Sequence, residues 1–139
     1  MSSMETPPWE RLEGQDDFRE RLRELSRNGD RRLFHPLDAG SYVVSIQASG
    51  EHASVPRAPA PAAEVEAWEV AIFSDDGRLL DETRDPELIA LPPEWLRYWR
   101  GGVGRFVPSA VLRVLLDRFA LGPEYFDRFV LEGSDPEWF

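Results

Sequence analysis

The chain contains no cysteine and no lysine, and its only histidines are His35 and His52. Without cysteine there is no thiolate nucleophile, no CxxC redox pair and no cysteine-ligated zinc. Without lysine there is no Schiff base and no P-loop lysine. Carboxylates, hydroxyls and two imidazoles remain, and their spacing matches none of the active-site motifs that such groups form. These absences favour a non-catalytic protein and leave the question of enzymatic activity open.

The sequence also lacks any apolar run that approaches the roughly 20 residues of a membrane span. Residues 1–13 carry prolines and acidic residues rather than a basic and then apolar leader, so we expect a cytoplasmic protein. The length of 139 residues suits one core. We therefore expect a flexible arm over residues 1–15 and a single domain over 16–139. The exclusive use of arginine among basic residues suggests a GC-rich bacterial coding sequence.

The formal net charge is −10, and the acidic residues are concentrated. Residues 65–94 contain nine acidic residues and two arginines, whereas residues 95–122 contain five arginines and one acidic residue. The acidic segment predicts a surface that attracts a basic protein partner, and the negative net charge disfavours nucleic acid as a ligand. The simpler alternative is a solvated face with internal ion pairs. The residues of this predicted acidic surface are Glu66, Glu69, Asp75, Asp76, Asp81, Glu82, Asp85 and Glu87.

Hydrophobic spacing predicts the order of the secondary-structure elements. Phe18, Leu22 and Leu25 recur at helical intervals, which predicts a helix from residue 16 or 17 to about 27, stopped by Asn28 and Gly29. Alternation predicts strands over 42–48, 65–73 and 78–82, with a turn at 74–77. Prolines and apolar periodicity predict helices over 92–99, from 108 to about 121, and over 123–131.

These elements predict an α+β domain. We expect a small antiparallel sheet of about three strands, with an N-terminal helix and two to three C-terminal helices packed on one face. The predicted core consists of Val44, Ile46, Trp68, Val70, Ile72, Leu112, Leu115 and Leu116. Residues 49–64 are rich in proline and alanine and predict an exposed loop, and residues 132–139 form an acidic, aromatic tail. The terminal aromatic residues either pack on the domain or bind a partner.

Three blocks of the sequence carry a resemblance. Residues 42–49 read YVVSIQAS and are followed by HASVPR at 52–57, residues 68–74 read WEVAIFS, and Phe106, Val107 and Pro108 precede a predicted helix. This order resembles a group of small uncharacterised phage and bacterial proteins with Y-x-V-S-I/V-Q-x-S followed by H-Y-S-x-P-R, then a V-E-V-G-F-P-S-like strand and a Y-V-P motif. In this chain Ala53 replaces the tyrosine after the histidine, no proline precedes Ser74, and the linkers differ in length. The resemblance implies a phage or mobile-element setting and supplies no activity. It draws attention to four polar residues, Gln47, His52, Ser54 and Arg57.

Two functional hypotheses follow. The first is a non-catalytic acidic interaction protein, as an accessory or inhibitory factor of a mobile element that binds a basic partner. The second is a small enzyme or ligand-binding domain that uses Gln47, His52, Ser54 and Arg57. A pocket that gathers these four side chains would favour the second, and a convex acidic hairpin would favour the first. We expect no cofactor and no metal ion, because a metal site would need His52 together with the distant His35 and carboxylates.

Overall fold

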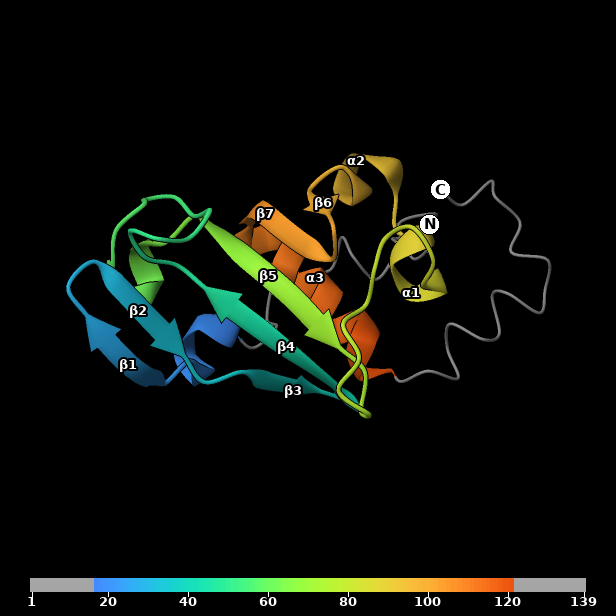
Figure 1. The fold of residues 1–139 in the computed structure, drawn as a ribbon, viewed down its shortest axis with the longest axis horizontal. Helices are drawn as coiled ribbons and strands as arrows, with labels where there is room; N and C mark the ends of the chain where they lie inside the picture. The colour runs from blue at the N-terminus through green and yellow to red at the C-terminus, as the bar shows by residue number, and fades with distance from the viewer. Residues whose placement is uncertain (1–16, 122–139) are drawn as a thin grey trace, which may run out of the picture.

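A five-stranded antiparallel sheet dominates the computed structural model of the protein, which describes residues 17–121 (Figure 1). Its strands lie in the order β3-β4-β5-β7-β6, and a separate two-stranded ribbon is formed by β1 and β2. The strands of the large sheet are β3 (Leu37–Ala39), β4 (Tyr42–Gln47), β5 (Ala67–Phe73), β6 (Trp99–Arg100) and β7 (Val103–Pro108). The ribbon consists of β1 (Glu24–Asn28) and β2 (Arg31–Phe34).

One face of the sheet is covered by α3 (Ser109–Ala120), which lies behind the strands in Figure 1. Two single-turn helices, α1 (Pro86–Ile89) and α2 (Pro93–Leu96), contribute Leu88, Trp95 and Leu96 to the same core. Two short 3-10 turns, η3 (Phe18–Arg21) and η4 (Ala62–Glu64), complete the described elements. Of the helices within residues 17–121, none is both long and apolar enough to cross a membrane.

Several predicted elements are confirmed. The strand predicted over 42–48 is β4, and the strand predicted over 65–73 is β5. The helix predicted after Pro108 is α3. All eight residues of the predicted core are buried, because both strands and α3 turn their apolar stripes toward one another. The predicted helix at 123–131, the arm at 1–15 and the tail at 132–139 lie outside the described residues.

The predicted N-terminal helix is wrong. Residues 18–21 form the short turn η3, and residues 24–28 form β1. Asn28 and Gly29, interpreted from the sequence as a helix stop, have other roles: Asn28 ends β1 and pairs with Arg31, and Gly29 with Asp30 makes the turn between β1 and β2, where Gly29 has a φ of +63°. A Gly-Asp pair between two strands is a hairpin signal, because glycine tolerates a positive φ in the turn. Leu25, the third residue of the supposed stripe, is 54% exposed.

The predicted three-strand sheet with helices on one face is also wrong, because residues 17–121 form seven strands in two sheets and three short helices. Residues 78–82 do not form a strand, and only an isolated bridge joins Leu79 to Phe73. Instead, β7 occupies the place beside β5. The hairpin of β6 and β7 depends on Gly104, because a Cβ atom there would lie 2.9 Å from the Trp99 ring.

A pair of glycines tests how closely the β3–β4 turn is packed against α3. Gly29 and Gly40 have nearly the same φ, +63° and +64°, but a Cβ atom at Gly29 would meet open space. At Gly40 it would lie 2.9 Å from the backbone oxygen of Phe119. We expect Gly29→Ala to lower the free energy of unfolding by about 1 kcal/mol through the left-handed conformation alone. Gly40→Ala should cost a further 1–3 kcal/mol, roughly, through overlap with the helix. Urea unfolding of both variants measures the difference, and equal losses would contradict the contact.

Candidate functional site

The fold brings the three blocks of the resemblance together at the central strand. The backbone N–H of Ala53 donates to Glu69 Oε1 on β5 at 2.8 Å. The carbonyl of Ala53 in turn accepts the N–H of Phe106 on β7 at 3.1 Å. Two residues later, Val55 forms an antiparallel bridge with Ala67. The segment 49–57 is therefore tied to both β5 and β7, and we refer to this region as the loop junction.

A buried polar pair holds the turn of this loop. Ser49 Oγ lies 2.6 Å from His52 Nδ1, and the two residues are 0% and 8% exposed. The Ser49 hydroxyl donates to Nδ1 when the imidazole is neutral and carries its proton on Nε2. Burial lowers the pKa of His52, and its interaction with Glu69 raises this pKa only in part. Because Ser49 has no exposed surface, the pair orders the loop and does not present a nucleophile to a substrate.

Gln47 and Ser54 hold the backbone in a similar way. Gln47 Nε2 donates to the Phe34 carbonyl at 3.0 Å, and its Oε1 accepts the Phe34 N–H at 2.8 Å. The Gln47 amide thus bonds both backbone groups of Phe34, as a neighbouring strand would do. It does so at the place where Pro36, which has no N–H, separates β2 from β3. Ser54 Oγ donates to the carbonyl of Pro56 at 3.0 Å. Both side chains are buried and used by the fold.

Arg57 differs from the other three predicted polar residues. It is exposed, and no residue between 17 and 121 pairs with its guanidinium. The loop that carries it is anchored instead by Arg32, which is 3% exposed and donates to the Ala48 and Ala60 carbonyls at 2.7 and 2.6 Å. Burial lowers the pKa of this Arg32 guanidinium. The geometry therefore does not gather Gln47, His52, Ser54 and Arg57 around one pocket.

Sequence reasoning missed the unusual backbone at Phe106. Two residues of β7, Arg105 and Phe106, face the single residue Glu69, which makes a β-bulge. Phe106 has a φ of +54° and its side chain is 45% exposed. A bulky residue rarely adopts this left-handed conformation, which costs about 1–2 kcal/mol. The Phe106 ring is thus exposed at the loop junction on a strained backbone. In the sequence, the only signal of the bulge is the extended segment before Pro108.

Most residues of the predicted acidic surface make contacts within the fold. Both carboxylate oxygens of Glu82 accept backbone N–H groups of Gly101 and Gly102, at 2.7 and 2.9 Å. Asp85 is buried, accepts the N–H of Asp81 at 2.7 Å and pairs with Arg78 at 2.6 Å. The remaining bonded members are Glu69 with Ala53, Asp81 with Thr83, and Glu87 with the Tyr42 hydroxyl.

Three members of the acidic set stay on the surface. Glu66 and Asp75 are exposed, and neither carboxylate has a partner among residues 17–121. Asp76 is exposed and accepts the Ser74 hydroxyl within its own turn, a hydrogen bond that lowers the pKa of Asp76. Asp75 and Asp76 are neighbours in the turn after β5, so two negative charges are presented together there.

The face of the sheet opposite α3 is apolar at its centre. Cross-strand partners share a face, so the register places Val43 beside Phe73, and the bridge places Phe73 beside Leu79. In the next row, Ala71 lies between Ser45 and Val103. All these side chains are half-buried, and Figure 1 shows no described helix over this face. We call Val43, Ala71, Phe73, Leu79 and Val103 the apolar patch.

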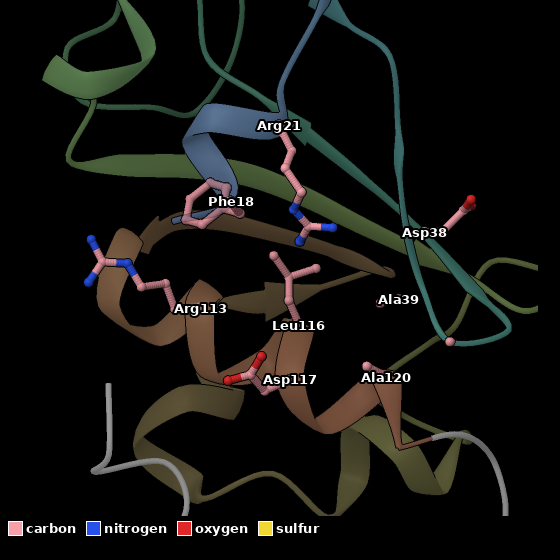
Figure 2. Close-up of a pocket in the computed structure, with 9 residues that line it drawn as sticks. Phe18, Arg21, Asp38, Ala39, Arg113, Leu116, Asp117 and Ala120 are labelled. Atoms are coloured by element: carbon pink, nitrogen blue, oxygen red, sulfur yellow. The ribbon is translucent and has the colours of Figure 1, made fainter. Parts of the chain in front are cut away.

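A hollow of about 260 Å³ lies on the other side of the sheet, between η3, the β3–β4 turn and α3 (Figure 2). Phe18 and Leu116 form its apolar floor. Figure 2 shows the Arg21 side chain pointing toward Leu116, whereas Asp38 points away from the hollow. The four residues that the sequence predicts for ligand binding are absent from its lining. Apart from Asp38, its charged lining residues are Arg21, Arg113 and Asp117, which are of both signs, so the hollow selects no charge.

Comparisons of the chain with protein-family models, with curated proteins and with solved structures gave no match.

The buried imidazole predicts a pH-dependent stability. Because burial lowers the pKa of His52, the unfolded chain binds the proton more tightly than the folded chain. This contribution to stability is fully present above the ordinary histidine pKa of about 6.5 and is lost as the pH falls below it. We expect the free energy of unfolding to decrease between about pH 7 and 5.5, by at most about 1.4 kcal/mol per pH unit.

His52→Gln should remove most of this pH dependence, and His35→Gln serves as the control substitution at an exposed histidine. Urea unfolding at several pH values measures the slope. Since the chain has two histidines, the ring signal that disappears in His52→Gln identifies His52 in NMR spectra. A His52 signal that titrates at or above the ordinary histidine pKa of about 6.5 would contradict the burial argument.

The strain at Phe106 is measured by comparing two substitutions that remove the same ring. At a φ of +54° glycine is relaxed and alanine is not, so Phe106→Gly should be more stable than Phe106→Ala by about 1 kcal/mol. At Phe73, in the extended strand β5, the order should reverse, with glycine less stable by about 0.5–1 kcal/mol. Thermal or urea unfolding of the four variants tests the sign, and the same order at both positions would refute the strain.

Proposed function

We propose that this protein is a non-catalytic interaction protein that binds a basic protein partner through the acidic turn after β5. The observation that carries the proposal is the exposure of Asp75 and Asp76, side by side, in that turn. Arg78, the nearest basic residue in the sequence, is paired with the buried Asp85. The turn therefore presents two exposed carboxylates to solvent, of which Asp76 also accepts the backbone N–H of Arg78 at 3.2 Å and is attracted by its positive charge.

The polar groups of the loop junction support a binding role over a catalytic one. Gln47, Ser49 and Ser54 are buried. Gln47 and Ser54 donate to backbone carbonyls, and Ser49 is hydrogen-bonded to His52. A catalytic hydroxyl or imidazole must reach a bound substrate. These side chains instead stabilise the rigid scaffold that displays the surface. The resemblance to phage and bacterial proteins makes a partner from the same host or mobile element our first expectation.

The test begins with capture of the partner from extracts of the source bacterium, followed by kinetics with the purified pair. Opposite charges across an interface accelerate association, and salt screens this effect. We expect Asp75→Asn with Asp76→Asn to slow association about threefold to tenfold at low salt, and less at physiological salt. The folded stability should change little, because both residues are exposed.

The matched control removes two charges elsewhere. Glu20→Gln with Glu94→Gln neutralises two exposed carboxylates outside the turn and changes the net charge by the same amount. We expect a much smaller effect on association from this control. If both double variants associate with the partner as fast as the wild type at low ionic strength, the acidic turn has no role in binding.

A further inference from the structure

We propose that the apolar patch, with Asp38, Asp75 and Asp76 around it, is the docking surface for a short, extended segment of the partner that has an apolar centre and basic ends. The inference rests on the proposed function, from which it takes the basic partner. It adds a second contact surface and the chemistry of the segment that fits it.

The patch is contiguous because the register aligns its members across the strands. Asp38 pairs with Val43, Val43 pairs with Phe73, and Phe73 is bridged to Leu79. Strands lie about 4.8 Å apart, so this row is roughly 14 Å long. An extended chain of about five residues has the same length. A short strand-like segment laid across the sheet can therefore contact the whole row.

The alternation of the strands fixes the character of this face. Val44, Ile46, Val70 and Ile72 point to the core under α3 and are buried. Their neighbours Val43, Ala71 and Phe73 must point to the opposite face, where they stay half-buried. A strand face turned to solvent normally carries polar residues, so valine, phenylalanine and leucine side by side mark a surface that a partner covers.

The charged residues around this row that have no oppositely charged side chain paired with them among residues 17–121 are negative. Asp38 is exposed at the β3 end of the row. Asp75 and Asp76 are separated from Phe73 by Ser74 and are exposed in the turn after β5. Arg78 lies beside Leu79, but its Nη1 is 2.6 Å from Asp85 Oδ1. A basic residue at one end of a bound segment would thus meet Asp38, and one toward the other end would lie beside the acidic turn that joins Phe73 to Leu79.

The neighbouring row of side chains on this face has a different charge at its end, and this difference decides which row the segment occupies. It runs from Ser45 through Ala71 and Val103 to Arg100, which is exposed on β6. A basic segment lying along this second row would meet an arginine at its end. The charge pattern therefore selects the row of Val43, Phe73 and Leu79, where the apolar side chains are also larger.

The experiment separates the apolar and the charged contributions with synthetic peptides of equal length. The first peptide has valine and leucine at its centre and two arginines at each end. The second replaces the centre with serine, and the third replaces the arginines with glutamate. Fluorescence anisotropy of labelled peptides measures their binding to the full chain. We expect the first peptide to bind, and the second and third peptides each to bind with an affinity lower by about tenfold or more.

Two sets of protein variants then locate the binding. Val43→Thr with Phe73→Thr keeps strand-forming side chains and should weaken binding of the first peptide about tenfold at every salt concentration. Leu25→Thr with Ile89→Thr changes two exposed apolar residues outside the patch and should leave binding unchanged. Circular dichroism and urea unfolding verify that both double variants are folded.

The outcomes distinguish this inference from the proposed function. If the Asp75 and Asp76 substitutions weaken binding of the captured partner but those of Val43 and Phe73 do not, the acidic turn binds the partner and the inference about the apolar patch is wrong. If the serine-centred peptide binds as well as the first, the contact is purely electrostatic and the inference is overturned. If sedimentation shows a dimer that Val43→Thr with Phe73→Thr dissociates, the patch is occupied by a second copy and the inference is also wrong.

Discussion

The indole ring of Trp68 packs against Phe18 and Phe34, with ring centres 5.4 and 6.3 Å away, and its Nε1–H donates to the Ser109 hydroxyl at 2.8 Å. Trp68 is fully buried near the start of β5, the central strand of the large sheet. A buried tryptophan needs a partner for its N–H, and Ser109 at the start of α3 supplies it. This contact determines which face of β5 meets the helix. The opposite face, with Ala71 and Phe73, is consequently turned outward.

The polar residues near the loop junction show why chemically suggestive side chains need not be functional. Gln47, Ser49, His52 and Ser54 are all buried, and each is bonded to backbone or to a neighbouring side chain. A buried donor or acceptor without a partner costs about 1–3 kcal/mol, so an irregular loop packed against a sheet requires such side chains. The Arg32 guanidinium also holds this loop, because it donates to the carbonyls of Ala48 and Ala60 at its two ends.

The acidic segment divides in the same way into structural and surface residues. Glu82 binds the backbone of the β6–β7 turn, and Asp85 binds both Arg78 and the backbone of residue 81. These carboxylates replace hydrogen bonds that the irregular chain between β5 and β6 cannot make with itself. Once they are accounted for, the members of the predicted acidic surface that stay exposed are Glu66, Asp75 and Asp76, and the last two lie together in the turn next to an apolar strand face. The surface on which the proposals rest is therefore much smaller than the net charge suggests.

The sequence by itself determined the elements whose apolar spacing is strong and local: β4, β5 and α3, with Trp68, Val70 and Leu115 in the core. It also predicted the four polar residues and the acidic segment as positions of interest. It did not predict β1, because Phe18, Leu22 and Leu25 fit a helical stripe until Gly29 adopts a left-handed hairpin turn. The pairing of β7 with β5, the bulge at Phe106 and the use of each carboxylate depend on contacts between residues far apart in the chain. Only the tertiary structure decided these, because long-range pairing and hydrogen-bond satisfaction have no periodic signal in a single sequence.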